Sequence, residues 1–283
     1  MSGAAIPLDN APTKAKKRVG QQPGIRRALI GLAFLLAALL LVLPVIVIFV
    51  EALALGIGAY LDAILEPSTL HAVWLTLLAA IVVVPINIAF GICAAWCITR
   101  FDFKGKKLLI TVIEIPFSIS PIVAGVAYLF LYGTQGLLGP FLGAHNIQIM
   151  FSLPAIFLAS MFVTSPFVAR ELIATMQVQG NEYEEAALSL GAGGFKTFLL
   201  VTLPNMKWGL LYGALLCNAR VMGEFGAVSV VSGSIRGQTN TLPLQIELLF
   251  NDYSAVGAFA AATLLTLLAL LSLIAKLWLE RQR

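Results

Sequence analysis

The sequence predicts an all-α, polytopic membrane protein with six transmembrane helices. Hydrophobic residues make up 59% of the 283-residue chain and charged residues only 11%, whereas soluble domains carry about 25% charged residues. Six apolar runs are each long enough to cross a hydrocarbon core, which takes roughly 20 residues. The runs are continuous and do not alternate, so we expect helices and not barrel strands. They lie near 28–50, 72–99, 108–132, 151–169, 208–231 and 254–276.

Basic residues between the runs predict the orientation. Sixteen of the 18 lysines and arginines fall before the first run, between runs two and three, between runs four and five, or after run six; Arg170 is counted with the fourth-to-fifth segment. Cytoplasmic loops are rich in Lys and Arg, so both termini are expected in the cytoplasm. The other two are Arg220, inside run five, and Arg236, in an outer loop where it could meet an anionic ligand or only solvent. The net charge of +4 therefore reflects orientation and does not indicate nucleic-acid binding.

The chain divides into four regions. Residues 1–27 form a polar, basic cytoplasmic extension that is expected to be disordered. Residues 28–52 form a first transmembrane helix, too long for the apolar part of a signal peptide and without an evident cleavage site. Residues 66–277 form the transmembrane core, which includes a polar cytoplasmic segment at 170–207, and residues 278–283 form a cytoplasmic tail.

The polar segment contains two short predicted helices that meet at a glycine corner within residues 181–204. Asn181 is expected to cap the first helix, with Glu184 reaching back in a capping box. Gly191 suits the C′ position, where a positive φ is often needed. Pro204 is expected to end the second helix. A segment this polar, in a chain that otherwise has the composition of a membrane protein, indicates contact with something outside the membrane.

Signatures of catalysis or nucleotide binding are missing from the sequence. The stretch from Gly191 to Thr197 approaches a phosphate loop, but Phe195 stands where G-x-x-x-x-G-K-[ST] requires its second glycine. The two histidines, His71 and His145, have no partner spacing for zinc, and no G-x-S-x-G elbow is present. We therefore expect no metal site, no cofactor in this chain, and no ATP hydrolysis by this chain itself.

Arg220 and Glu224 form an ionisable pair inside the fifth run. At i, i+4 they share one helix face, so each partly offsets the cost of about 2.5–3.5 kcal/mol that a charge carries at a helix centre. Gly223 and Gly226 flank the glutamate and would permit a bend or close helix contact. Two interpretations stay open: the four residues line or gate a permeation route, or the pair is structural and locks spans together.

The segment 181–204 resembles the EAA loop of bacterial ABC importer permeases. That pattern is E-A-A, three residues, G, nine residues, an aliphatic residue, any residue, then L-P. This sequence matches the pattern at every position, and Val201 stands where Ile is commoner. The matching residues are Glu185, Ala186, Ala187, Gly191, Val201, Leu203 and Pro204. The resemblance implies that these residues dock on a separate ATPase.

From about residue 66 onward the chain is similar to the sulfate/molybdate branch of these permeases. Asn218-Ala-Arg-x-x-Gly-Glu-Phe-Gly resembles the fifth-span signature of that branch, and residues 227–247 are most similar to the CysW family of sulfate/thiosulfate importer subunits. The basic N-terminal extension matches no feature of the family. The resemblance implies the transmembrane domain of a type I ABC importer, multi-pass in the bacterial inner membrane.

The same resemblance implies the partners and the function. The partners are a homologous CysT-like permease, two CysA-like ATP-binding subunits that hold ATP and Mg²⁺, and a periplasmic sulfate- or thiosulfate-binding protein. The implied function is ATP-driven import of sulfate or thiosulfate by alternating access. Two alternatives stay open: a molybdate or tungstate permease, expected as a homodimer, and a self-sufficient anion channel or secondary transporter.

Overall fold

The computed structural model describes residues 23–280, and this part of the chain is entirely helical, which confirms the predicted fold class. The elements are α1 (Pro23–Ala37), η1 (a π turn, Ala38–Val42), α2 (Leu43–Ala52), α3 (Gly56–Leu65), α4 (Pro67–Arg100), α5 (Lys106–Ser118), α6 (Pro121–Tyr132), α7 (Gly139–Ala144), α8 (Leu153–Gln179), α9 (Glu182–Ser189), α10 (Gly194–Thr197), η2 (a π turn, Phe198–Thr202), α11 (Leu203–Met222), α12 (Gly226–Val231), α13 (Leu242–Asn251) and α14 (Ala255–Glu280).

Five helices in the described part are long and apolar enough to cross a membrane, and a sixth span exists only if the bent pair of α5 and α6 counts as one. These two helices meet at 108°, so the third apolar run, 108–132, forms two helices and not one straight one. Proline disfavours helical backbone in the residue before it, and Ser120, which precedes Pro121, is extended with ψ 134°. Ile119 is extended as well. The helix therefore ends at Ser118 and restarts in a new direction.

The described chain forms two compact units, divided between Val47 and Ile48. The first contains α1, which already begins at Pro23, so the predicted boundary of the N-terminal extension at residue 27 is too late. The expected disorder of residues 1–22 concerns a segment outside the described residues. All the residues that the sequence singles out as functional lie in the second unit.

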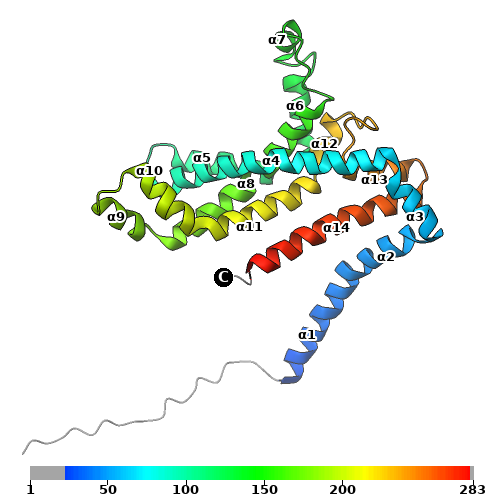
Figure 1. The fold of residues 1–283 in the computed structure, drawn as a ribbon, viewed down its shortest axis with the longest axis horizontal. Coiled ribbons are helices and arrows are strands. Elements are labelled where there is room, and N and C mark those ends of the chain that lie inside the picture. The colour runs from blue at the N-terminus through cyan, green and yellow to red at the C-terminus, as the bar shows by residue number, and fades with distance from the viewer. Residues whose placement is uncertain (1–22, 281–283) are drawn as a thin grey trace, which may run out of the picture. The chain divides into compact units, whose positions relative to one another are not determined.

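Small residues hold the centre of the second unit together. Helices α4, α8 and α11 pack against one another, and α14 packs against α11 (Figure 1). A Cβ at Gly91 of α4 would lie 2.6 Å from Cγ1 of Val168 in α8, and a Cβ at Gly213 of α11 would lie 3.2 Å from the Cα of Val168. A Cβ at Gly209 would overlap Thr175. Small residues at these crossings let the backbones approach closely.

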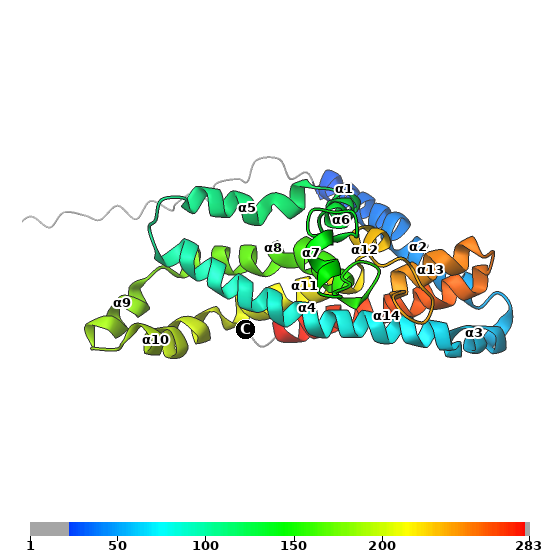
Figure 2. The ribbon, with the colours of Figure 1, turned by 90° about the horizontal axis from the view of Figure 1, so that it is seen from above.

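The two ends of this bundle carry different elements. Helices α9 and α10 lie at one end, and α3 and α13 lie at the other (Figure 1, Figure 2). The start of α13 is fastened to the start of α4: the Leu242 N–H donates to Thr76 Oγ1 at 2.8 Å, and Gln245 Nε2 donates to Ser68 Oγ at 3.0 Å. From the bend onward, α6 turns away from the bundle and packs against α12.

Candidate functional site: the polar corner and the buried ion pair

The glycine corner after α9 has the geometry that its sequence predicts. Gly191 has φ +86°, its N–H donates to the carbonyl oxygen of Leu188 at 2.9 Å, and the Ala192 N–H donates to that of Ala187 at 3.0 Å. These two bonds form a Schellman motif, which satisfies the last carbonyls of a helix. No atom lies within 4 Å of a Cβ built on Gly191. The requirement for glycine is therefore conformational and not steric.

The side chains expected to dock on a partner are open to solvent. Glu185 and Ala186 are exposed, and Ala187 is half-buried. Within the described chain Glu185 has no ion-pair partner. Beside it, the side chains of Leu190 and Phe195 are 89% and 75% exposed. The corner thus presents an apolar tip next to an unpaired carboxylate, a combination suited to a protein partner.

The capping box predicted for α9 is not formed. Asn181 is the N-cap residue, but its side chain makes no capping hydrogen bond. Glu184 does not reach back to it. Its carboxylate forms an ion pair with Arg100, the last residue of α4, and accepts a hydrogen bond from Thr202 Oγ1 at 2.7 Å. A guanidinium partner outcompetes a neutral backbone N–H for a carboxylate.

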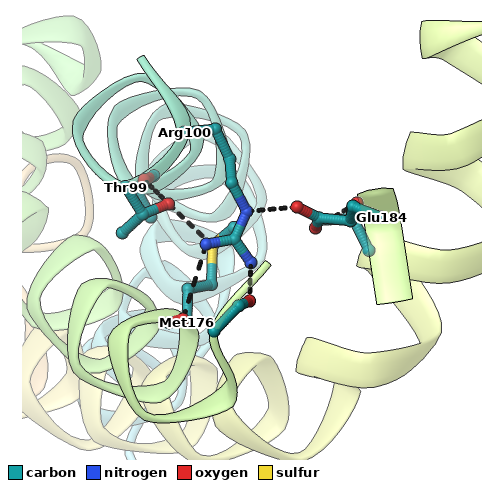
Figure 3. A network of polar contacts seen from close by, with 7 residues as sticks. Thr99, Arg100, Met176 and Glu184 are labelled. Atoms are coloured by element: carbon teal, nitrogen blue, oxygen red, sulfur yellow. Dashed lines mark hydrogen bonds and ion pairs between the residues drawn. The ribbon is translucent and has the colours of Figure 1, made fainter. Parts of the chain in front are cut away.

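Arg100 joins three segments at this end of the bundle. Its guanidinium pairs with Glu184 and donates to the carbonyl oxygen of Gly180 at 3.0 Å and to that of Met176 at 3.5 Å (Figure 3). The Arg100 and Glu184 side chains are only 11% and 13% exposed. We call Arg100, Glu184 and Thr202 the polar link. Sequence reasoning missed it, because Arg100 counted only toward orientation and Glu184 only as a local cap.

Apolar packing beneath α9 is incomplete, which leaves the polar link as its main attachment. A cavity of about 340 Å³ lies between α9, η2 and the end of α4, with Leu188, Trp96 and Phe198 in its lining. The Trp96 ring packs against Phe198 of η2 at 4.9 Å between centroids. This contact ties η2 to α4, but α9 has no buried residue of its own. The carboxylate of Glu184 therefore positions α9.

The last three residues of the predicted loop, Val201, Leu203 and Pro204, lie in a helix that continues past the proline. Val201 and Leu203 are half-buried and Pro204 is exposed. The helix runs from Gly194 to Met222 with the π turn η2 inside it, so the prediction that Pro204 ends it is wrong. In η2 the Leu203 N–H donates to a carbonyl five residues back. The wider turn relieves the clash that a proline ring makes in a regular helix.

The buried carboxylate of Glu224 bridges two helices. Its side chain is 1% exposed, and Oε2 lies 2.9 Å from Nη1 of Arg220, in the last turn of α11. Its other oxygen accepts a hydrogen bond from the N–H of Ala227 at 3.0 Å, in the first turn of α12. A carboxylate is favoured at a helix N-terminus. Of the two interpretations that the sequence leaves open, this geometry favours the structural pair.

The glycines beside Glu224 have the two roles that the sequence predicts for them. The α11 helix ends at Gly223, which gives the bend. A Cβ on Gly226 would lie 3.0 Å from Cβ of Pro121, the first residue of α6, which shows close helix contact. In the loop between α12 and α13, Arg236 forms an ion pair with Asp252 at the end of α13. Its charge is therefore partly neutralised.

Comparison with known proteins identifies the family. Residues 87–283 match the family model described as binding-protein-dependent transport system inner membrane component. The chain belongs to this family. This result agrees with the EAA loop, whose residues all fall inside the matched range. As a family member the chain is an inner membrane permease component of an ABC transporter.

Curated relatives of this permease are sulfate transport proteins. It is 54% identical over 252 residues to the sulfate transport system permease protein CysW of Escherichia coli K12, covering 89% of this chain and 87% of the relative. It is 47% identical over 258 residues to CysW of a Synechocystis species, covering 91% and 94%. Identity to CysT of Salmonella typhimurium LT2 is 34% over 244 residues, covering 86% and 88%. The predicted resemblance to the CysW family is confirmed.

A solved structure shares the permease fold. The crystal structure of a bacterial alginate ABC transporter, in complex with its alginate pentasaccharide-bound periplasmic protein, contains a chain that matches with a TM-score of 0.71 and 16% sequence identity. The match covers 91% of this chain and 94% of that one. At this identity the likeness concerns the fold alone.

Proposed function

We propose that this permease is the transmembrane subunit of an ATP-driven importer of sulfate or thiosulfate that works by alternating access. The observation that carries the proposal is the exposed corner from Glu185 to Gly191, built with EAA spacing in a chain 54% identical to a CysW sulfate permease. The higher identity to CysW than to CysT supports the CysW position within such a transporter.

The proposed assembly places the chain, multi-pass and with both termini in the cytoplasm, in the bacterial inner membrane. It pairs with a CysT-like permease, above two CysA-like ATP-binding subunits and below a periplasmic sulfate- or thiosulfate-binding protein. The ATP-binding subunits hold ATP and Mg²⁺, and this chain contributes no ATPase site. Ala186 is small enough to let α9 enter a groove on the ATPase, and Glu185 can bind a basic residue or backbone amides there.

Coupling uses the contacts at the α9 end of the bundle. Closure of the ATPase dimer displaces α9, and the polar link passes the displacement on. Through Arg100 it reaches α4 and the end of α8, and through Thr202 it reaches the helix that continues as α11. The bundle then changes between inward- and outward-facing states.

Reconstitution tests the function. The chain is co-expressed with a CysT-like permease, the ATPase and the binding protein, and the purified complex is placed in proteoliposomes. We expect uptake of radiolabelled sulfate or thiosulfate that requires ATP, the binding protein and the second permease. Uptake of molybdate by a complex with two copies of this chain would replace the substrate assignment. Sulfate flux through the chain alone, without ATPase, would overturn the importer assignment.

A further inference from the structure

Arg170 lies well inside helix α8 and not in a cytoplasmic loop. The helix continues to Gln179, and the carbonyl of Gly180 that follows is bonded to Arg100 at the end of α4, so the two helix ends are level. Ten residues separate Arg170 from Gly180, which is about 15 Å along a helix. A hydrocarbon core is about 30 Å thick. Arg170 therefore lies inside the candidate membrane span Leu153–Gln179, about 15 Å from the level at which α4 and α8 end.

The packing of α5 shows which part of that helix Arg170 faces. The guanidinium carbon of Arg170 lies 5.5 Å from the ring centroid of Phe117, and that ring packs edge-on against Phe167 of α8 at 5.2 Å. Phe117 stands eleven residues beyond Lys106, the basic residue at which α5 begins. Eleven residues of helix measure about 16 Å. Arg170 therefore lies level with the end of α5, just before the 108° bend.

Arg170 has no acidic partner in the described chain. Of the four arginines between residues 48 and 280, three form ion pairs within the described residues: Arg100, Arg220 and Arg236. Arg170 is exposed and forms none. Its neighbour Glu171 has its Cβ and Cγ beside Gly213 of α11.

An arginine without an ion-pair partner inside a candidate membrane span needs water or an anion. A charge at a helix centre is unfavourable by about 2.5–3.5 kcal/mol on insertion scales. A cation–π contact such as that with Phe117 recovers only about 0.5–1 kcal/mol at an exposed site. Membrane arginines accordingly face a bundle interior or a water-filled cavity. The exposed face of Arg170 is therefore expected to adjoin a polar path in the assembled transporter.

We propose that Arg170 is an anion-binding residue of the translocation route, and that Phe117 holds its guanidinium in place for a passing divalent oxyanion. The proposal rests on the proposed function for the identity of that anion. A guanidinium presents a planar fork of donors that matches two oxygens of such an anion. Arg220 is unsuited to this task, because Glu224 neutralises it.

Substitution of Arg170 in the complete transporter is the first test. At saturating binding protein, Arg170→Gln is expected to lower the maximal rate of sulfate uptake about tenfold or more, since a charge-assisted hydrogen bond is lost. Arg170→Lys keeps the charge but not the planar fork, so it should retain more of the rate than Arg170→Gln and less than wild type. Arg27→Gln, a control on an exposed residue of α1, should leave the rate unchanged. An unchanged rate for Arg170→Gln would overturn the proposal. Failure of that variant to assemble, where Arg170→Lys assembles, would show an ion pair with the partner permease instead.

Thiol labelling tests the water path without relying on transport. Arg170→Cys is made in a chain whose native Cys93, Cys97 and Cys217 are replaced by serine. We expect the new thiol, in the assembled complex, to react with charged methanethiosulfonate reagents. An unreactive thiol would contradict the proposal. If the wild-type complex imports no sulfate or thiosulfate but the thiol reacts, the proposed function fails while the water path stands.

Discussion

The carboxylate of Glu185 is exposed at the corner and has no ion-pair partner within the described chain. Replacing it with lysine should abolish ATP-driven uptake, because the substitution places a like charge against any basic residue on the ATPase. The complex should still reach the membrane, since Glu185 is exposed and supports no other described contact of its side chain. The matched control is Glu182→Lys in the same first turn of α9, likewise exposed. Equal uptake by Glu185→Lys and wild type, measured in vesicles, would refute the docking role.

Glu224 should matter for stability more than for passage of the anion. In Glu224→Ala the guanidinium of Arg220 and the N–H of Ala227 both lose their partner. Breaking a buried pair from one side costs on the order of 3–5 kcal/mol. We expect a lower unfolding temperature in detergent and poor assembly, and the same direction for Arg220→Ala, which leaves the carboxylate unpaired. Normal assembly of Arg220→Ala with slow transport would restore the pathway interpretation.

Which residues could be predicted from sequence depends on how local their partners are. Gly191 was predictable, because its positive φ and its motif spacing are properties of one short segment. The partner of Glu184 was not, since Arg100 lies 84 residues earlier (184 minus 100) and meets it only after folding. The capping box offered Glu184 a local partner at Asn181, but the ion pair with Arg100 forms instead. Arg170 was misplaced because hydropathy ended the fourth span ten residues before the end of α8.

At the scale of elements, the polar link makes α9 mechanically dependent on α4. Arg100→Gln and Glu184→Gln should each lower the amount of sulfate imported per ATP hydrolysed. Because both residues share one ion pair, the double variant should lose less than the sum of the two single losses. The measurement is uptake and ATP hydrolysis in the same proteoliposomes.

A second ion pair supplies the control for this double-mutant comparison of Arg100 and Glu184. Lys106 and Asp102 form an exposed i, i+4 pair near the start of α5. Exposed pairs contribute only about 0–1 kcal/mol, so Lys106→Gln and Asp102→Asn should leave the coupling ratio unchanged. Additive losses in the Arg100 and Glu184 cycle would show that the two residues act separately.

The elements themselves were largely predictable, and two of the exceptions involve proline. Apolar runs located every long helix, because each needs about 20 residues to cross the core. The break before Pro121 carried a local signal in the restricted residue that precedes it. Pro204 led to the opposite error, because it was predicted to end a helix that continues. A proline ends a regular helix, but the π turn η2 lets this helix continue past Pro204. The five residues of η2, Phe198–Thr202, carry no sequence signal for a widened turn.

At the scale of the whole molecule, the glycine crossings predict how little the bundle can deform. Sliding α8 along α11 would drive Val168 into the backbone at Gly213. Spin labels on cysteines placed at the exposed positions Ala174 of α8 and Leu211 of α11 should therefore report one distance in both nucleotide-free and ATP-bound transporter. A change beyond the ~1–2 Å by which packed helices shift would contradict this expectation.

The attachments at the two ends of α4 have a consequence for signalling. One helix of 34 residues, about 51 Å long, is tied at its last residue to α9 and near its first turns to α13. In the proposed transporter, α4 therefore connects the α9 end of the bundle with the α13 end. Linkage between two binding events is reciprocal, so coupling through α4 acts in both directions. In the proposed transporter, docking of a protein beside α13 is therefore expected to change the affinity of the ATPase for ATP, and ATP binding to change the affinity for that protein by the same factor.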